Sequence, residues 1–520
     1  MQRRTFLRSL AMGGAALAAR CAGAAPAPRP KSRKPNIVFI LADDMGYGDV
    51  RRYNPDGCIP TPRLNRLAEQ GRRFTDAHSP SAVCTPTRYG VLTGRYCWRT
   101  WLKRGVVGGY TPPLIEPQRT TVASFLRKHG YATACIGKWH LGLGWTRAGG
   151  FVGTWKNAKE HFNGSWQDGD PDEGMNVDFT KPIHGGPNAL GFDYAWYTAA
   201  CSTIDGPFCY IENDRTVGIP DKPIRVDKSK HPDFRPRPGW VAPGFDLETV
   251  DPTFTDKAVA FIERAQRERP DRPFFLYLAL SSPHAPWLPP ESMRGTTAEG
   301  PRGDLVALAD RCVGRVLDAL DRLDLAEETL VIATSDNGPR PGGYNHKSAG
   351  DWRGYKSHTW EGGHRVPFIA RWPGRIAPGS VCDEPICLVD LLATCAAIVG
   401  QPLPDDAGPD SYNVLPALLG EPRDEPIREA IVHHSVFGVF GIRQGPWKLI
   451  IDSKDSGGWV PPRGSGPKPG TPGQLYNLED DPREQLNLFD AHPEIVRRLT
   501  ALLDRYRDEG RSTPAGKNHG

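Results

Sequence analysis

The segment Asn36-Ile37-Val38-Phe39-Ile40-Leu41-Ala42-Asp43-Asp44 decides the fold that we expect for this chain. Its first seven residues form a continuous apolar run, which is typical of a parallel strand covered by helices on both faces. Two adjacent carboxylates follow directly. Functional side chains of open α/β sheets lie beyond the carboxyl ends of the strands, so Asp43 and Asp44 are well placed to hold a hard cation. Taken alone, such a pair before glycines is more often a loop or a helix cap.

Three later apolar runs end in the same way, with polar side chains at their carboxyl ends. They span 131–136, 274–280 and 330–334, and lead into Gly137-Lys138-Trp139-His140, Ser281-Ser282-Pro283-His284 and Ser335-Asp336-Asn337-Gly338. Segments with helical spacing lie between the strands, at 61–70, 120–129, 253–269 and 304–323. The alternation predicts an α/β domain over residues 35–400, with a large doubly wound, mixed or mostly parallel sheet flanked by helices.

Past residue 400 the pattern changes to short strand-like runs. These lie at 430–434, 440–443, 447–451 and 475–478, and a helical segment follows at 493–506. The pattern predicts a smaller C-terminal subdomain over 401–520, an antiparallel sheet with one helix. His433 and His434 could reach the active site from this side, although a structural role is the more common one for such histidines.

The first 24 residues are expected to be a twin-arginine signal peptide, followed by a linker over 25–34. Arg3-Arg4 precede an apolar run at 10–19 and the small residues Ala22-Gly23-Ala24, a plausible cleavage site. The alternative is a disordered basic tail. The apolar run is too short to span a bilayer, so we expect no stable membrane insertion. The prediction is a periplasmic or secreted protein that uses the twin-arginine export machinery.

The charge of the chain bears on its binding partners, and its cysteine content bears on disulfide bonds. The formal net charge is +5, but residues 1–34 carry eight positive charges, and without them it is −3. There is no basic stripe or nucleic-acid motif, so no nucleic-acid partner is expected. Of the eleven cysteines, Cys201 with Cys209 and Cys382 with Cys387 are close enough in sequence to be bridged, and free buried thiols are equally expected.

The most informative motif is Cys84-x-Pro86-x-Arg88, followed by Leu92-Thr93-Gly94-Arg95. We expect Thr85 to cap a helix that Pro86 begins, which would place residue 84 where backbone N–H groups favour an anion. Arg88, one turn further on, would lie on the same face and fork toward that anion. For Cys84 alone, an ordinary buried or disulfide-bonded cysteine is the alternative.

With the strand-end motifs, Cys84-x-Pro86-x-Arg88 resembles the signature of type I sulfatases of the alkaline-phosphatase-like superfamily. The motifs occur in sulfatase order, and Lys356 precedes Glu361-Gly362-Gly363-x-Arg365. The resemblance implies a sulfuric ester hydrolase in which a formylglycine-generating enzyme oxidises Cys84 to Cα-formylglycine. One hydroxyl of the hydrated aldehyde would attack sulfur to give a covalent sulfo-enzyme, and the other would expel sulfate.

The resemblance also implies the roles of single residues. Arg88, Lys138 and Lys356 would neutralise the sulfate group. His140 would be the base for sulfate elimination, and His284 the acid that protonates the leaving alkoxide. The implied catalytic set is thus Cys84, Arg88, Lys138, His140, His284 and Lys356, and the implied ligands of Ca²⁺, with Mg²⁺ less expected, are Asp43, Asp44, Asp336, Asn337 and the modified Cys84.

The expected substrate is a sulfated carbohydrate, because aromatic and acidic loop residues of an exported enzyme suit a polyhydroxylated ligand. Asp205, in the loop 201–215, is the expected substrate contact. Two alternatives remain open at this point. One is a phosphodiester or phosphonate monoester hydrolase that uses the same diol, and the other is a catalytically silent protein that binds sulfated glycans with residue 84 left as cysteine.

Overall fold

The structure is a computed structural model that describes residues 34–161, 176–225, 229, 237–342, 346–451, 456–459 and 472–514. The expected signal peptide, and the linker apart from Lys34, lie outside the described residues. All the helices and strands below belong to one compact unit, residues 35–520.

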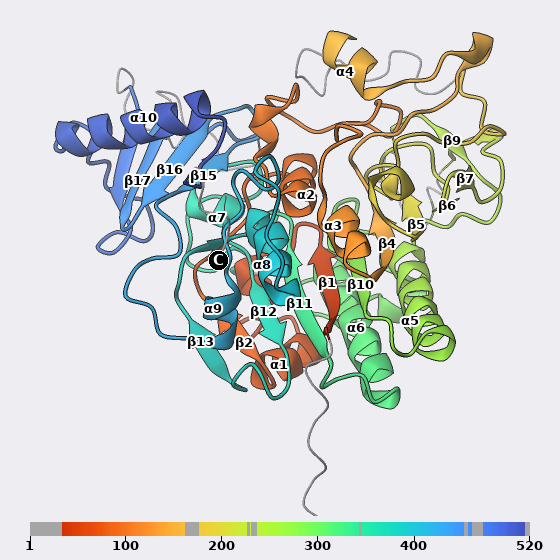
Figure 1. Cartoon of the computed structure of the whole chain (residues 1–520), viewed down its shortest axis with the longest axis horizontal. Coiled ribbons are helices and arrows are strands. Elements are labelled where there is room, and N and C mark those ends of the chain that lie inside the picture. The colour runs from red at the N-terminus through yellow and green to blue at the C-terminus, as the bar shows by residue number, and fades with distance from the viewer. Residues whose placement is uncertain are drawn as a thin grey trace, which may run out of the picture. The chain divides into compact units, whose positions relative to one another are not determined.

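A ten-stranded sheet runs through this unit, in the order β13-β2-β12-β11-β1-β10-β4-β5-β6-β7 (Figure 1). Five neighbouring strands run parallel: β11 (Thr329–Ser335), β1 (Asn36–Ala42), β10 (Phe274–Ala279), β4 (Ala132–Lys138) and β5 (Tyr194–Thr198). The flanking strands are β12 (Phe368–Arg371), β2 (Arg72–Phe74), β13 (Ser380–Cys382), β6 (Ile211–Glu212) and β7 (Arg215–Thr216), and β12, β6 and β7 pair antiparallel. The expected large, mostly parallel mixed sheet is confirmed.

Helices bury both faces of the sheet, which explains why β1 is apolar from Ile37 to its end at Ala42. Ile37, Phe39 and Leu41 lie in one hydrophobic core, and the alternate residues of the strand lie in the other. The first core includes residues of α2 (Cys84–Thr93), α3 (Val122–Lys128) and α8 (Leu391–Val399), and the second includes residues of α1 (Pro62–Glu69), α5 (Val250–Glu268) and α6 (Pro301–Arg322).

Shorter elements complete the main part of the chain. The helices are α4 (Trp155–His161), α7 (Glu361–His364) and α9 (Leu415–Leu419), and the short strands are β3 (Ala77–His78), β8 (Lys222–Pro223), β9 (Trp240–Val241) and β14 (Ile386–Cys387). The 3-10 turns are Tyr47–Asp49, Cys97–Arg99, Ala148–Gly150, Pro187–Leu190, Glu291–Met293 and Leu388–Asp390.

A second sheet of four antiparallel strands lies at the C-terminal end of the chain, as expected. Its strands are β15 (Ile431–His434), β16 (Phe440–Gln444), β17 (Trp447–Ile451) and β18 (Gln474–Asn477). Helix α10 (Pro493–Asp508) covers it and buries Leu499, Leu503 and Tyr506, which recur every three or four residues (Figure 1).

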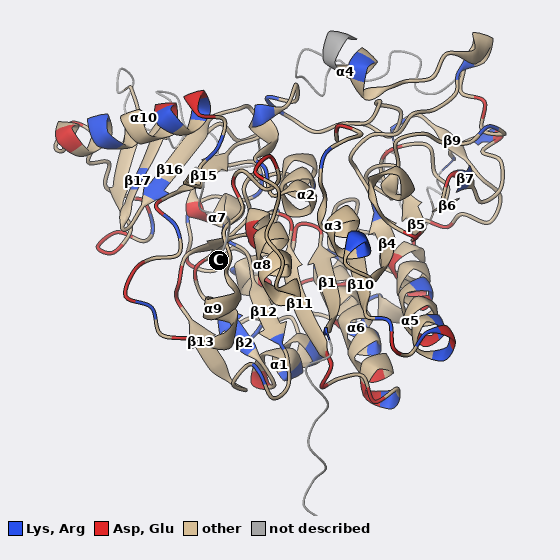
Figure 2. Cartoon of the chain, viewed as in Figure 1, with Lys and Arg blue, Asp and Glu red and all other residues tan. Residues whose placement is uncertain are grey.

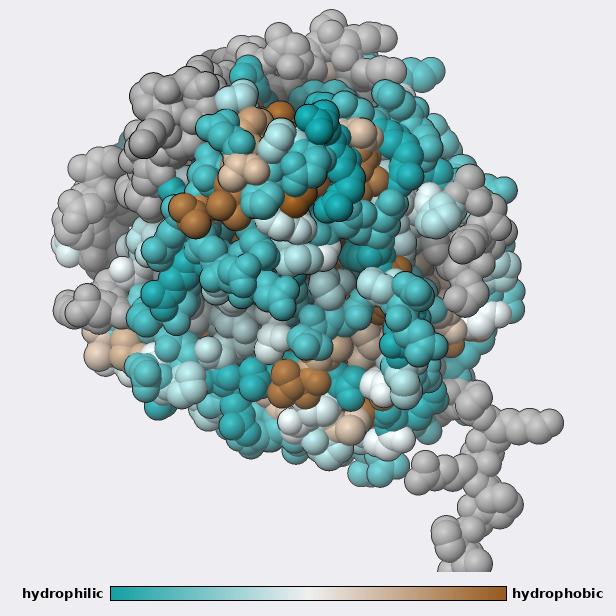
Figure 3. All heavy atoms as spheres, turned by 90° about the vertical axis from the view of Figure 1, so that its left-hand side faces the viewer, coloured by the Kyte–Doolittle hydropathy of each residue, from teal (hydrophilic) through white to brown (hydrophobic). Residues whose placement is uncertain are grey.

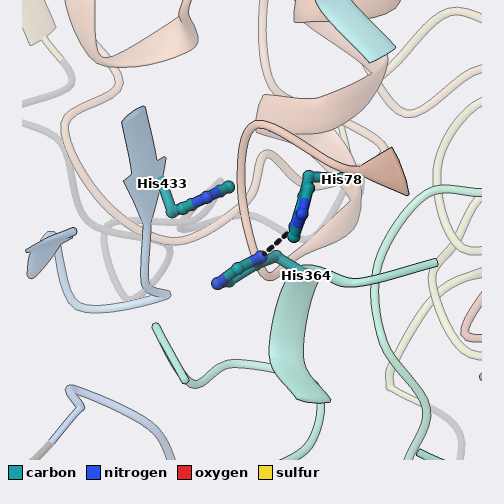
Figure 4. A group of neighbouring side chains, drawn as sticks. All are labelled: His78, His364 and His433. Atoms are coloured by element: carbon teal, nitrogen blue, oxygen red, sulfur yellow. Dashed lines mark hydrogen bonds between the residues drawn. The ribbon is translucent and has the colours of Figure 1, made fainter. Parts of the chain in front are cut away.

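Three buried histidines lie where this small sheet meets the large part of the chain. His78 comes from β3, His364 from α7 and His433 from β15 (Figure 4). Nδ1 of His78 lies 3.0 Å from Nδ1 of His364, and the rings of His364 and His433 stack with centroids 3.6 Å apart and planes 9° from parallel. Burial lowers the pKa values of all three, so at neutral pH the rings are uncharged.

Three ion-paired carboxylates surround these rings. Asp76 contacts His78, Arg365 and Arg443 at 2.6–2.8 Å, and Lys448 lies 3.0 Å from Glu361 and 2.8 Å from Glu484. We call the whole set, which is His78, His364, His433, Asp76, Glu361, Glu484, Arg365, Arg443 and Lys448, the junction cluster. It ties β3 and α7 to β15, β16 and β17, and His433 is therefore a structural residue.

The surface carries both signs of charge. Lys, Arg, Asp and Glu are interspersed along α5, α6 and α10 (Figure 2). On the face drawn in Figure 3, the hydrophobic residues form small patches separated by hydrophilic ones. Within the described residues, no helix is both long enough and apolar enough to cross a membrane.

Candidate active site

The strand register brings the predicted site residues to one edge of the large sheet. Ala42 of β1 is level with Ser335 of β11, so Asp43 and Asp336 lie side by side, and the backbone N–H of Asp336 donates to the Ala42 carbonyl at 3.0 Å. Lys138 ends β4, and His284 follows β10, the strand between β1 and β4. Four strands therefore deliver the carboxylates, cations and histidines to one place, as expected for the carboxyl edge of an α/β sheet.

The backbone is strained at two of these positions. Asp44 has φ 66° and His140 has φ 57°, both in the left-handed region that non-glycine residues rarely adopt. Gly137, just before Lys138, has φ 117°, and a Cβ there would lie 1.9 Å from the Ala279 carbonyl oxygen of β10. Strain of this kind persists where the surrounding structure holds a side chain in a required direction.

Helix α2 starts two residues earlier than the sequence suggested. It begins at Cys84, with Val83 as the N-cap and no side-chain cap, so the expectation that Thr85 caps a helix beginning at Pro86 is wrong. The reason is tertiary: the Thr85 hydroxyl donates to the backbone carbonyl of His140 at 2.9 Å. Residue 84 still lies at the helix N-terminus, where backbone N–H groups favour negative charge.

Three buried cations surround residue 84. Arg88 donates to Asp336 Oδ2 at 2.8 and 3.0 Å and to the Lys138 carbonyl at 2.8 Å, so it braces a carboxylate as well as facing residue 84. Lys138 Nζ contacts Asp43, and Lys356 Nζ lies 2.6 Å from Asp44 Oδ1 and 3.7 Å from Cys84 Sγ. Burial alone would raise the pKa of Asp43, but the charges of these neighbours outweigh it and hold that pKa well below its usual range.

Three buried oxygen atoms of the same cluster have no hydrogen-bond partner. They are Asp43 Oδ1, Asp44 Oδ2 and Asn337 Oδ1. The Asn337 side-chain N–H₂ donates to Asp44 Oδ1 at 2.7 Å, which fixes its oxygen as the free atom. Buried oxygens without donors are costly unless a cation is present, and carboxylate and amide oxygens are the ligands that Ca²⁺ and Mg²⁺ take. The residues present therefore fit a hard divalent cation.

Backbone carbonyls fix the tautomers of both predicted catalytic histidines. His140 Nε2 donates to the Val107 carbonyl at 2.8 Å, and His284 Nδ1 donates to the Ala285 carbonyl. His140 Nδ1 and His284 Nε2 are left as lone pairs within the site. Burial and the neighbouring Lys138 lower the pKa of His140, so that ring is neutral at pH 7 and can accept a proton.

One residue of the site was not singled out for it by the sequence. Cys201 Sγ lies 3.1 Å from Lys138 Nζ, 3.8 Å from His140 Nδ1 and 3.7 Å from His284 Nε2. A bridge to Cys209 was one expectation, but all ten described cysteines are free, including Cys382 and Cys387. Only the proximity of Cys201 to Asp205 in the sequence pointed toward the site.

Asp205 is buried beside Cys201. Its carboxylate accepts from the Cys201 backbone N–H at 3.3 Å and pairs with Arg237, whose side chain is half exposed, at 2.5 Å. The structure thus places Asp205 at the edge of the site with one cation already attached.

Comparisons with known proteins agree with this geometry. A family model described as Sulfatase matches residues 35–401. The chain is 35% identical to an N-acetylgalactosamine-6-O-sulfatase of Bacteroides thetaiotaomicron, over 91% of this chain and 93% of the relative, and 34% identical to human arylsulfatase A, over 91% and 87%. A solved 6S-sulfatase structure connected with glycosaminoglycan metabolism in Bacteroides thetaiotaomicron covers 92% of this chain and 100% of its own, with TM-score 0.76 and 31% identity.

These findings define the class of the protein as sulfuric ester hydrolase. Within that class the chain belongs to the sulfatase family, as a type I sulfatase of the alkaline-phosphatase-like superfamily. It hydrolyses sulfate esters. The other two expectations, phosphodiester or phosphonate hydrolysis and glycan binding without catalysis, have no support from these relatives.

Proposed function

We propose that this sulfatase works through a formylglycine derived from Cys84, with Ca²⁺ held by Asp43, Asp44, Asp336 and Asn337. One observation carries the proposal: three unpartnered buried oxygens and three buried cations converge beside residue 84, at a helix N-terminus. A buried thiol with ordinary packing would need neither set.

Formation of the aldehyde is a two-electron oxidation of Cys84, which an outside enzyme would carry out with an oxidant such as dioxygen. The Cβ–S bond of Cys84 is replaced by C=O, one oxygen atom enters the aldehyde, and the sulfur leaves as hydrogen sulfide. The second oxygen atom leaves as water with two electrons and two protons from a reductant. A formylglycine-generating enzyme is therefore an expected partner.

The formylglycine would supply the nucleophile, and the bound cation would supply part of the positive charge that stabilises the sulfate group. The hydrated aldehyde offers one hydroxyl for attack on sulfur and a second for release of sulfate. Bound Ca²⁺ offers Lewis-acid stabilisation of negative oxygens. The remaining tasks fall to the side chains of the site.

Side chains of this chain orient the sulfate and move the protons. Lys138 and Lys356 hold the sulfate oxygens, and Arg88 keeps Asp336 in place. His140 Nδ1 carries a lone pair on a ring whose pKa is lowered. It accepts the proton that the second hydroxyl of residue 84 loses as sulfate leaves. His284 presents Nε2 from the loop after β10, where a protonated ring would donate to the leaving alkoxide.

The leaving-group role of His284 has its own kinetic test. In His284→Ala, hydrolysis of sugar or alkyl sulfates should slow about 10²–10⁴-fold, while activated aryl sulfates, whose phenolate needs no proton, should slow much less. Equal losses on both substrate types would contradict the role.

We propose a sulfated carbohydrate as the substrate. The N-acetylgalactosamine-6-O-sulfatase relative supports this proposal, because the similarity extends over most of both chains. Asp205 remains the proposed substrate contact, with its partner Arg237 beside it. The test is a comparison of kcat/KM on N-acetylgalactosamine 6-sulfate, an aryl sulfate and a steroid sulfate, followed by Asp205→Ala on the best substrate. An unchanged KM in that variant would remove Asp205 from the substrate site.

The formylglycine is tested by the mass of the proteolytic peptide that contains residue 84, from protein produced in its native host. A peptide trapped by an aldehyde-reactive hydrazide is the expected result. A peptide with only unmodified cysteine in catalytically active protein would overturn the proposal.

We further propose that the chain is exported by the twin-arginine route to the periplasm or the medium. The paired arginines and the small residues 22–24 support it. Fractionation and the mass of the N-terminal peptide test it: a mature chain that starts near residue 25 is expected, and an intact Met1 in the cytoplasmic fraction would contradict export.

A further inference from the structure

The active site holds a second set of possible metal ligands beside the oxygen set. The Sγ atoms of Cys84 and Cys201 and a ring nitrogen of His284 all lie within 4.8 Å of one another. His140 Nδ1 adds a fourth atom, 3.8 Å from Cys201 Sγ. Two cysteines and two histidines are a common ligand set of structural zinc sites.

The spacing agrees with that chemistry. In a tetrahedral site with Zn–S of about 2.3 Å and Zn–N of about 2.0–2.1 Å, sulfur and nitrogen ligands lie about 3.6 Å apart. The observed distances from Cys201 Sγ are 3.7 Å to His284 Nε2 and 3.8 Å to His140 Nδ1. Cys84, Cys201 and His284 form one compact group, and His140 lies beside the same sulfur in a second group, with Asp205.

Both histidines are already oriented as ligands. Each donates its other ring N–H to a backbone carbonyl, His140 to Val107 and His284 to Ala285, so the nitrogen next to Cys201 carries a lone pair. Zinc ligands in proteins are commonly held by such outer hydrogen bonds. The arrangement also differs from a chance gathering of histidines, in which the free nitrogens point in different directions.

Positive charge adjacent to both sulfurs offsets the cost of two buried thiolates. Lys138 Nζ lies 3.1 Å from Cys201 Sγ, and Lys356 Nζ lies 3.7 Å from Cys84 Sγ. These lysines also contact Asp43 and Asp44, so the sulfur set and the oxygen set share their counter-charges.

The two sets prefer different ions. Thiolates and imidazoles favour zinc-class cations, whereas carboxylate and amide oxygens favour calcium-class cations. We propose that the chain in which residue 84 is still cysteine binds one zinc-class cation between Cys84, Cys201, His140 and His284. The site needs the Cys84 sulfur, so it belongs to the precursor of the enzyme and is lost when residue 84 is converted.

The test uses the full chain produced without a formylglycine-generating enzyme, kept reduced with a phosphine and shown by peptide mass to retain Cys84. Cobalt(II) is added as a spectroscopic substitute for zinc. One equivalent should produce a thiolate-to-cobalt charge-transfer band in the near ultraviolet, and one equivalent of Zn²⁺ should displace it.

Matched variants assign the band to these sulfurs. Cys201→Ser and Cys84→Ser should each weaken cobalt binding more than about 100-fold, since even the loss of an outer hydrogen bond costs 10–100-fold. Cys209→Ser is the control, because Cys209 is also a buried free thiol but lies outside the set. Circular dichroism checks that each variant is folded, and Cys201→Ala provides a second substitution if serine disturbs the fold.

Three results would overturn the proposal. These are the absence of a charge-transfer band, a band of full intensity in Cys201→Ser, and a precursor whose mass shows a disulfide between Cys84 and Cys201 under the reducing conditions. The result is also separable from the proposed mechanism. If the chain binds zinc but residue 84 is never converted in its native host, the formylglycine mechanism is wrong and this zinc site stands. If the enzyme is converted and active but its precursor binds no cobalt, the mechanism stands and this zinc site is wrong.

Discussion

The active site and the junction cluster are both buried, and both combine carboxylates, cations and histidines, yet they differ in which polar atoms are left without a partner. In the active site three oxygens, on Asp43, Asp44 and Asn337, have no donor. In the junction cluster the atoms without a hydrogen-bond partner are His433 Nε2 and Glu484 Oε1, and the latter lies 2.8 Å from the Lys448 ammonium. Only the active site gathers free carboxylate and amide oxygens, which are the ligands of a hard cation, and such a group is costly while no cation is bound.

The histidines of the two regions differ in the same sense. His140 and His284 direct their free nitrogens toward one sulfur atom. His364 and His433 are stacked face to face, with planes 9° from parallel, so their in-plane lone pairs cannot meet at one ion (Figure 4). A group of three histidines is therefore not in itself a metal centre, and ring orientation separates the ligand set from the packing set.

Loss of the reacting residue should give the largest effect. In Cys84→Ala, kcat/KM on a sulfate ester should fall at least about 10⁴-fold, because the nucleophile is removed. The free energy of unfolding should change by less than about 2 kcal/mol, since a small buried side chain is only shortened. Steady-state kinetics and urea unfolding measure the two quantities, with Cys209→Ala as the matched buried thiol. Substantial residual activity would assign the nucleophile elsewhere.

The junction cluster should respond in the opposite way. Lys448→Met leaves Glu361 and Glu484 buried without their ammonium partner, which should lower the free energy of unfolding by about 3–5 kcal/mol. The kcat of the folded fraction should stay within about threefold of wild type, because in the described part of the chain the partners of Lys448 are junction residues and not residues of the active site. Lys347→Met, in an exposed pair with Asp351, should cost less than about 1 kcal/mol. A large loss of kcat in folded Lys448→Met would show that the two regions are coupled.

The sequence predicted the active site far better than the junction cluster, for a physical reason. Asp43 and Asp336 directly follow an apolar strand, Lys138 ends one and His284 lies five residues past another. Parallel strands bring such ends together whatever the loops do. Each position could therefore be read from its own neighbours.

The junction cluster and Cys201 depend instead on distant contacts. His78 and His364 are 286 residues apart, and Cys201 is 63 residues from Lys138. No local pattern reports which of many buried polar residues will meet. The predicted start of α2 is wrong for the same reason. The Thr85 hydroxyl, which would otherwise have capped the helix, donates instead to a carbonyl 55 residues away.

Metal addition tests the unpaired oxygens directly. Ca²⁺ at 100 times its Kd should raise the free energy of unfolding by about 2.7 kcal/mol, because it binds the folded chain and not the unfolded one. Asn337→Ala removes one of the three free oxygens and should abolish most of the gain. Lys448→Met, with an intact site, should keep it. An equal gain in wild type and Asn337→Ala would place the stabilising ion elsewhere.

The smallest effect concerns His434, which neighbours His433 on β15 but packs against Phe440 instead of the junction rings. Burial lowers its pKa to about 4, against about 6.5 in the unfolded chain. Between these values the unfolded chain binds a proton that the folded chain does not, so acidification favours unfolding. From pH 7.5 to 5 this histidine alone should lower the free energy of unfolding by about 2 kcal/mol.

The variant His434→Gln cannot take up this proton, so its free energy of unfolding should fall by about 2 kcal/mol less than that of wild type over the same interval. Urea unfolding of both proteins at the two pH values gives this difference, in which the contributions of the other histidines cancel. Equal losses would mean that His434 is protonated as readily in the folded chain as in the unfolded one, and the acid sensitivity would then come from other buried groups, such as His140 and the junction histidines.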